Sequence, residues 1–199
     1  MSDPRAKKRR LWAILIVGGL WIAWMDGSLM RLFSFPPGQG QALVKAGYWL
    51  GHGSVGLPVL LAIWLLAWIV RRPHLARAAA MSILAFIFSG VAVQVVKHLV
   101  GRPRPRLWAE GAHFIGPTFV DGYNSFPSGH TTTSMAVAVV LSWYYPKGAP
   151  IFFAGASFVA ASRILGGSHF PLDVLGGVAL GLFIGGFVAI IGRPRRSAE

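Results

Sequence analysis

Residues 171–191 read PLDVLGGVALGLFIGGFVAII, an apolar run in which Asp173 is the only charged side chain. About 20 apolar residues cross the hydrocarbon core of a bilayer as a helix, and about 17 can suffice. This run is therefore long enough to span a membrane. The whole chain is 54% hydrophobic and only 13% charged, which is too apolar for an ordinary soluble domain. We expect a single membrane domain.

Five further apolar runs with short basic flanks qualify as spanning helices. Several of the runs are shorter than the usual length, so we expect tilted or partly buried helices. The fold class that follows is all-α, a six-transmembrane-helix bundle. The five runs cover residues 11–33, with Asp26 as an interruption, and residues 55–70, 78–96, 130–145 and 150–165.

The two ends of the chain are basic. Residues 1–10 carry five Lys and Arg residues ahead of an apolar stretch, as a secretory signal peptide does. The residues just before Asp26 offer no cleavage site with small side chains, so we expect an uncleaved anchor. The predicted parts are a cytoplasmic N-terminus over residues 1–10, the six-helix membrane domain over 11–192 and a cytoplasmic tail over 193–199.

Six spans place both termini on the same side of the membrane. Of the 19 Lys and Arg residues, 12 then lie on that side, and the positive-inside rule makes it the cytoplasm. The opposite side receives two longer connections, residues 26–54 and 97–127, and long connections in compact proteins are usually functional. The net charge of +13 is spread between apolar segments rather than along one soluble face, so we expect no nucleic-acid partner.

Three polar clusters fall at the ends of predicted helices, all on the non-cytoplasmic side. The helix count made no use of them, so their convergence on one face supports both predictions. The clusters are Lys97 with Arg104-Pro105, then Pro127-Ser128-Gly129-His130, then Ser162-Arg163 with His169 and Asp173.

The cations Lys97, Arg104 and Arg163 lie at the membrane edge, where an unpaired charge is expensive. Guanidinium groups bind phosphate oxygens through two hydrogen bonds and a lysine adds a point charge, so we expect these three to bind a phosphate group. Snorkelling toward lipid headgroups is the alternative for a Lys or Arg near a helix end. We expect that alternative for Arg102 and Arg106.

Ser128 and Gly129 stand where a helix should begin, directly after Pro127. Free backbone N–H groups and the helix dipole favour an anion at such a helix start. Gly129 lets the backbone approach a phosphate closely. The Ser128 hydroxyl either donates to that anion or only caps the helix, and the sequence leaves both open.

Two histidines divide the catalytic work in this interpretation. His169 precedes Asp173 by four residues near a helix start, so the carboxylate can accept a hydrogen bond from one imidazole nitrogen. The other nitrogen of His169 is then free to attack phosphorus. His130 would protonate the leaving group and later activate water.

A metal site is the rival constellation. The spacing H-x-x-x-H does not occur, and the three cations would repel a divalent ion, so we expect no metal and no other cofactor. Cysteine is missing from the chain, which excludes a thiolate ligand. His52 and His74 are interpreted as loop residues. The side chains considered for the metal were His98, His113, Asp121, His130, His169 and Asp173.

Taken together, the three clusters resemble the signature of the type 2 phosphatidic acid phosphatase (PAP2) superfamily, K-x6-R-P, P-S-G-H and S-R-x5-H-x3-D, at every position between residues 97 and 173. The resemblance implies a metal-free phosphatase of the integral-membrane branch. It also implies His169 as nucleophile assisted by Asp173, and His130 as acid and base. The phosphate ligands that it implies are Lys97, Arg104, Ser128, Gly129 and Arg163.

The expected function is hydrolysis of a lipid phosphomonoester or diphosphate through a phosphohistidine, with membrane lipids as partners. Undecaprenyl diphosphate, phosphatidylglycerol phosphate, phosphatidate and a lipid A phosphate are all candidates, and the oligomeric state is left open. We expect a bacterial inner-membrane protein whose active site faces the periplasm or cell exterior. Two alternatives remain: transfer of the phosphate to another lipid, and a transporter or scaffold without catalysis.

Substrate choice should depend on the first outer connection, residues 26–54, and on the loop over residues 107–126, because both flank the predicted site. Their aromatic side chains either line a lipid groove or form an interfacial belt, and the belt is the safer interpretation for any one of them. They are Trp49, Trp108, Phe114, Phe119 and Tyr123.

Overall fold

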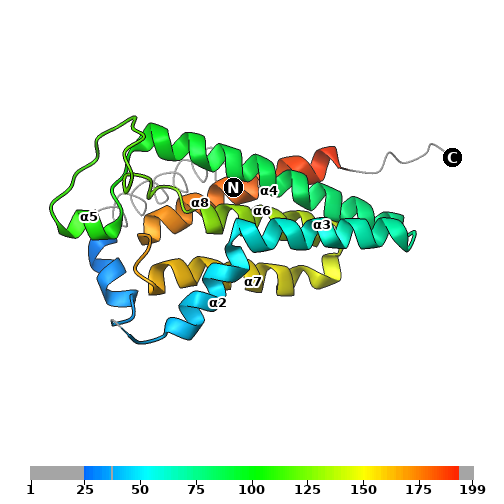
Figure 1. The fold of residues 1–199 in the computed structure, drawn as a ribbon, viewed down its shortest axis with the longest axis horizontal. Helices are drawn as coiled ribbons and strands as arrows, with labels where there is room; N and C mark the ends of the chain where they lie inside the picture. Colours follow the sequence, from blue (N-terminus) through cyan, green and yellow to red (C-terminus); the bar gives the residue numbers. More distant parts are fainter. Residues whose placement is uncertain (1–24, 37, 193–199) are drawn as a thin grey trace, which may run out of the picture.

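The structure is a computed structural model that describes residues 25–36 and 38–192. All regular structure in these ranges is helical, as the sequence predicts, and the long helices lie side by side along one axis (Figure 1). Residues 25–33 are helical. The helices that follow are α2 (Gln41–Gly51), α3 (Gly53–Ile69), α4 (Pro73–Val100), α5 (Pro105–Ala109), α6 (Gly129–Tyr144), α7 (Ala149–Leu165) and α8 (Pro171–Ile191), with a 3₁₀ turn, η1 (Pro146–Gly148), before α7.

Three stretches among the described residues are long and apolar enough to cross a membrane: Pro73–Ala109, Pro146–Leu165 and Pro171–Ile191. The pair α2 and α3, bent by 51°, makes a fourth if it counts as one span. Helix α6 has 16 residues and is short for a span. Four predicted ranges coincide with α3, α6, α7 and α8 to within two residues.

The structure differs from the predicted helices in two places. Helix α4 extends well beyond the predicted 78–96, because Pro73 suits the first turn and Gly101, with φ 57°, ends the helix in the left-handed region. The connection over residues 26–54 contains a helix, α2, which was not predicted. The first predicted span and the N-terminal anchor lie largely outside the described residues.

Helix α2 packs closely on α7 through its small residues. A Cβ at Gly47 would lie 2.3 Å from Oγ of Ser162, and one at Gly51 would lie 2.5 Å from Cγ1 of Val159. Only glycine permits this approach. The end of α2 therefore lies beside His130 at the start of α6, because a Cβ at Gly51 would lie 3.2 Å from Cδ2 of His130.

The pair α6 and α8 forms the centre of the bundle. Gly177, Gly181 and Gly185 recur every four residues and so share one face of α8. A Cβ at these positions would lie 2.8, 2.6 and 2.7 Å from three backbone oxygens of α6 and its N-cap, those of Ser128, Thr132 and Ala136 respectively. The two backbones are therefore in near contact, as in small-residue helix packing in membranes.

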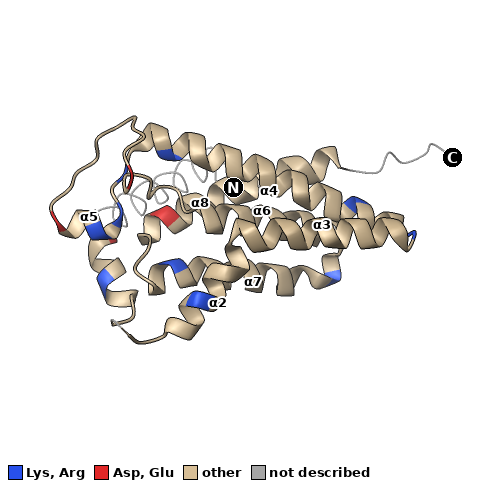
Figure 2. Cartoon of the chain, in the orientation of Figure 1, with Lys and Arg blue, Asp and Glu red and all other residues tan. Residues whose placement is uncertain are grey.

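The outer surface of the bundle suits lipid. Phe183 on α8 is 73% exposed and Ile151 on α7 is 76% exposed. Figure 2 shows the charged residues toward the two ends of the bundle, with the acidic ones at the end that carries α5. An apolar middle between charged ends is the distribution expected of an integral membrane protein.

Candidate active site

A cavity of about 410 Å³ lies where α4 ends and α6 begins. Six of the eight predicted site residues line it: Lys97, Arg104, Gly129, His130, Arg163 and His169. The other two, Ser128 and Asp173, are fully buried and stand outside this lining. The structure thus brings residues from α4, α6, α7 and two connections to one place.

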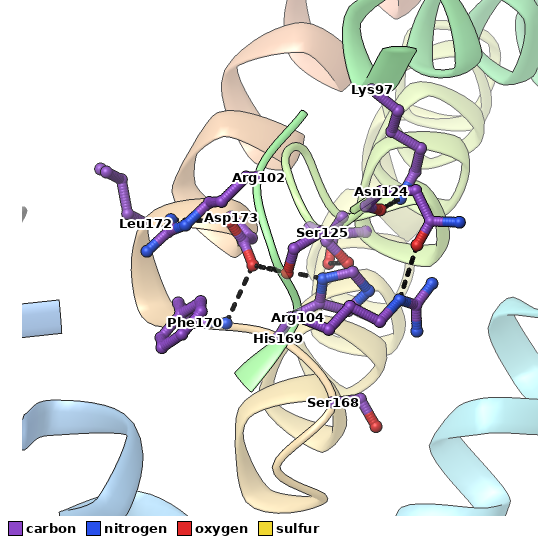
Figure 3. Close-up of polar contacts among 12 residues, drawn as sticks. Lys97, Arg102, Arg104, Asn124, Ser125, Ser168, His169, Phe170, Leu172 and Asp173 are labelled. Atoms are coloured by element: carbon purple, nitrogen blue, oxygen red, sulfur yellow. Dashed lines mark hydrogen bonds and ion pairs between the residues drawn. The ribbon is translucent and has the colours of Figure 1, made fainter. Parts of the chain in front are cut away.

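Lys97 and Arg104 are both held by Asn124, a residue that the sequence did not reveal. Lys97, in the last turn of α4, donates from Nζ to the backbone oxygen of Asn124. Arg104 precedes α5 and donates from Nε to Oδ1 of the same Asn124 at 2.7 Å. Figure 3 shows Asn124 between the two cations. Asn124 thus orients Lys97 through its backbone oxygen and Arg104 through its side-chain amide, and neither neutral contact cancels the charge of the cation.

Arg163, in the last turn of α7, is buried beside the cavity. Its guanidinium donates to the Val44 backbone oxygen at 3.3 Å and to Oγ of Ser162 at 3.2 Å, and it lies over the ring of Tyr48 at 5.3 Å. Among the described residues, no Asp or Glu lies within ion-pair distance of Arg163, Lys97 or Arg104. Their positive charge is left for an anion in the cavity.

Helix α6 begins at this cavity. Its N-cap residue, Ser128, makes no side-chain cap hydrogen bond, so the capping alternative for that hydroxyl is wrong. Instead, Oγ of Ser128 accepts from Oγ1 of Thr131 at 3.0 Å. The first N–H groups of α6, from Gly129 onward, therefore have no side-chain acceptor at the N-cap and favour an anion.

His169 lies in the connection before α8, with Nδ1 3.4 Å from Oδ2 of Asp173. That oxygen also accepts from the Phe170 backbone N–H at 3.0 Å and from Oγ of Ser125 at 2.6 Å (Figure 3). Burial lowers the pKa of His169, and the hydrogen bond with Asp173 opposes that effect. His169 is therefore neutral at pH 7, with Nδ1 turned to Asp173 and Nε2 left for chemistry.

His130, the second residue of α6, lies beside two aromatic neighbours on the α2 side. Its ring centroid is 5.1 Å from that of Tyr48 and 5.6 Å from that of His52. Nε2 of His130 is buried and has no hydrogen-bond partner within the described ranges. The protein thus leaves this nitrogen without a competing partner, which suits a group that exchanges a proton with substrate.

His52 is a site residue that the sequence interpretation missed. It stands in the break between α2 and α3, as the loop interpretation predicts, and it also lines the cavity, which that interpretation did not predict. Nδ1 of His52 accepts from the Ser54 backbone N–H at 3.2 Å, which leaves Nε2 as the protonated nitrogen of the neutral ring. His74, in contrast, contacts Tyr145 at the other end of α4.

Arg102 does not snorkel, so that prediction is wrong. Only 5% of it is exposed, and it donates to Oδ1 of Asp173 at 2.7 Å and to Oδ2 of Asp26 at 2.5 Å. An acidic residue inside an apolar run signals a need for a buried partner, and Asp26 carried that signal. Arg106 is the opposite case, because its side chain is 90% exposed beside Glu110.

The side chains considered for a rival metal site do not come together. In the part of the chain that the structure describes, no group of three or more His, Cys, Asp or Glu residues could hold a metal ion. His98 contacts the Thr118 backbone oxygen at 2.9 Å, and His113 lies beside Trp108. These histidines therefore belong to the packing of the loop after α4.

A second, apolar groove of about 360 Å³ adjoins the cavity. The two share Gly51, Phe86 and Thr133, and the rest of the groove is formed by Leu50 of α2 and by residues of α3, α6 and α7. None of the loop aromatics proposed for a lipid groove lines either space. Helices of the bundle thus make most of the groove, and the first outer connection, residues 26–54, contributes Leu50 and Gly51 at the end of α2.

Comparison with known proteins gives a consistent set of relatives. Residues 78–197 match a family model described as the PAP2 superfamily. The chain is 32% identical over 107 residues to a lipid A 1-phosphatase of Rhizobium johnstonii, covering 53% of this chain and 44% of that protein. It is 36% identical over 115 residues to a decaprenylphosphoryl-5-phosphoribose phosphatase of Mycobacterium tuberculosis, covering 58% and 61%. The chain therefore spans about half the length of the curated relatives it matches.

The fold also has a solved counterpart. The structure matches a transmembrane PAP2 type phosphatidylglycerolphosphate phosphatase from Bacillus subtilis with a TM-score of 0.70, at 22% identity, over 96% of this chain and 98% of that chain. Identity at this level shows the fold alone. The likeness extends over nearly the whole chain.

Proposed function

This chain belongs to the PAP2 superfamily, and from that premise we propose that it is an integral membrane hydrolase that removes phosphate from a phosphorylated lipid. The observation that carries the proposal is the cavity where three cations lack a carboxylate partner among the described residues and where His130 and His169 face the same space, with His52 beside them. Such a site is built for phosphoryl transfer.

The first step is attack by Nε2 of His169 on phosphorus. A nitrogen–phosphorus bond forms and the bond from phosphorus to the lipid oxygen breaks, while His130, which takes up a proton when the phosphate anion binds beside it, gives that proton to the lipid oxygen. Lys97, Arg104 and Arg163 bind the other phosphate oxygens, together with the free backbone N–H groups at the start of α6, whereas Ser128 is buried outside the cavity lining. Their charge stabilises the negative charge of the transition state.

The second step regenerates the enzyme. His130, now neutral, accepts a proton from a water molecule, whose oxygen attacks the phosphohistidine. The nitrogen–phosphorus bond breaks, inorganic phosphate leaves, and His169 returns to its neutral form. Asp173 holds the imidazole in one tautomer throughout, because its carboxylate faces Nδ1.

The groove between α3, α6 and α7 supports a lipid as the substrate. Its lining is apolar and it meets the cavity at Gly51 and Thr133, so one molecule can place a phosphate in the cavity and a hydrocarbon chain in the groove. The substrate class is therefore a phosphomonoester or diphosphate of a lipid. The groups that its relatives' names specify, a lipid A phosphate and a polyprenyl-linked phosphate, both fit this description.

We also propose six spans with both termini in the cytoplasm of a bacterial inner membrane and the cavity on the opposite side. The Lys and Arg distribution in the sequence supports this orientation. A cytoplasm-specific reporter fused to the C-terminus should give full signal. Loss of that signal, with gain of signal from a periplasm-specific reporter, would invert the topology.

The activity test uses purified protein in detergent with a panel of lipid phosphates labelled on phosphorus. Hydrolysis predicts labelled inorganic phosphate from at least one lipid and none from a His169→Ala variant. Label that appears only on a second lipid would show that the protein transfers phosphate to that lipid instead of hydrolysing the substrate. Full phosphate release by His169→Ala would mean that the site is not catalytic.

A further inference from the structure

A buried charge network lies directly behind His169, and the mechanism above does not use it. Arg102 stands between two carboxylates, with Nη1 on Asp173 at 2.7 Å and Nη2 on Asp26 at 2.5 Å. All three side chains are at least 94% buried. A guanidinium in such surroundings binds both carboxylates tightly, because water does not compete for it.

Asp26 has a second contact, at the start of α8. Its Oδ1 accepts from the backbone N–H of Leu172 at 2.8 Å, while Oδ2 faces Arg102. The carboxylate therefore links the helical segment 25–33 both to Arg102 and to the first turn of α8, one residue before Asp173. Asp26 fixes the position of the carboxylate that faces His169 through two independent contacts.

Arg102 also decides which oxygen of Asp173 is available. It occupies Oδ1, and this leaves Oδ2 for His169, Ser125 and the Phe170 backbone N–H. The ring of Phe170, which is fully buried, lies 4.2 Å from the guanidinium carbon. The stacked ring prevents Arg102 from turning away, so the carboxylate keeps one orientation.

We propose that Asp26 and Arg102 are positioning residues for this reaction, which act through Asp173 to set the orientation and basicity of the His169 imidazole. The proposal rests on the proposed function, in which His169 is the nucleophile. Neither residue lines the cavity, so neither is expected to touch substrate. Their loss should reduce kcat and leave KM nearly unchanged.

The two residues should act on His169 with opposite signs. The groups that face His169 are Asp173, Lys97 and Arg104, with His130 on the other side of the cavity. Without the charge of Asp26, Arg102 neutralises Asp173 more completely, and the protonated imidazole is less stabilised. Without Arg102, Asp173 faces His169 with its full charge, and the protonated imidazole is more stabilised.

The test measures the His169 titration and the kinetics in Asp26→Asn and Arg102→Gln. Histidine-ring NMR in detergent, with the His169 signal assigned from a His169→Gln variant, should show a lower midpoint in Asp26→Asn and a higher one in Arg102→Gln. Each variant should lose about 10- to 100-fold in kcat, as supporting residues around a reactive site do. Asp26→Glu keeps the charge and should keep the wild-type midpoint.

Glu110→Gln is the matched control, because Glu110 lies in the same outer loop in an exposed ion pair. It should change neither the His169 midpoint nor kcat.

If Arg102→Gln does not fold, Asp26→Asn alone decides, since it leaves the contact between Arg102 and Asp173 in place. An unchanged midpoint in folded Asp26→Asn, or a kcat loss that matches a loss of folded protein, overturns the proposal. The titration needs no turnover, so a wild-type protein that releases no phosphate would overturn the proposed function and leave the titration to judge the positioning role.

Discussion

Arg102 and Arg104 are separated by one proline, yet they lie in two different regions. Arg102 belongs to the buried network, paired with two carboxylates, and is absent from the cavity lining. Arg104 belongs to the cavity, where its Nε contacts the neutral amide of Asn124. The charges beside each arginine, and not its residue type or its place in the sequence, therefore decide whether it supports the fold or binds a ligand.

The largest effect should come from the cavity itself. His169→Ala removes the proposed nucleophile, so kcat should fall by about 10⁴-fold or more, as for other nucleophiles that work with a partner. Phosphate release from a lipid phosphate by purified protein measures the effect. His74→Ala is the matched control, since His74 contacts Tyr145 away from the cavity, and it should be fully active. Comparable activity of the two variants would remove His169 from the mechanism.

The next effect separates the two arginines directly. Arg104→Gln removes a cation that faces the phosphate, and kcat/KM should fall about 10²- to 10³-fold with thermal stability preserved. Arg102→Gln leaves Asp26 and Asp173 without their buried partner, a loss that costs about 3–5 kcal/mol of folding free energy. Melting in detergent should therefore distinguish the two variants, with exposed Arg106→Gln as the control. Equal melting temperatures for all three variants would show that Arg102 does not stabilise the fold more than Arg104 does.

A smaller effect concerns pH. His169 attacks only when neutral, and burial lowers its pKa, so kcat/KM should fall with decreasing pH along a limb whose midpoint lies below about 6.5, the value of an ordinary histidine. Above that midpoint, His169 stays neutral. A phosphate monoester also titrates near pH 6, so two substrates with different phosphate pKa values should be compared. A limb that moves with the substrate, or lies above about pH 6.5, contradicts the assignment.

The smallest effect concerns the groove rather than the charges. Gly155 lines the apolar groove and has open space where a Cβ would lie. Gly155→Leu should occupy part of the groove and raise KM for a long-chain lipid phosphate about 10-fold, equivalent to one buried apolar side chain. A short soluble phosphate ester should be unaffected. Gly186→Leu, also with open space but outside the groove, is the control, and equal behaviour of the two variants would mean that the groove does not hold the chain.

The helices of this fold could be predicted from sequence because crossing a bilayer is a demand on length and hydropathy along the chain. Residues 171–191 met it and form α8. Helix α2 was missed because its contacts with α7 depend on Gly47 and Gly51, and glycine carries no helix signal.

The cavity residues could be predicted for a related reason. Each motif lies at the end of a helix, and the alternating direction of the helices brings those ends together. The buried network was missed because Asp26 and Arg102 are 76 residues apart and their pairing is a fact of three-dimensional packing. Asn124 was missed because one amide in a loop forms no pattern.

The near contact of α6 and α8 has a consequence for how this protein can change. Gly177, Gly181 and Gly185 set the distance between the two backbones, and the backbone N–H of Ser128 donates to the backbone oxygen of Asp173 at 2.9 Å across that contact. The positions of the reacting groups on α6 and α8 therefore depend on backbone contact and little on side-chain volume. The groove-lining residues of α3 and α7 can be changed to suit other lipids without altering this contact, whereas alanine at Gly181 would separate the two helices.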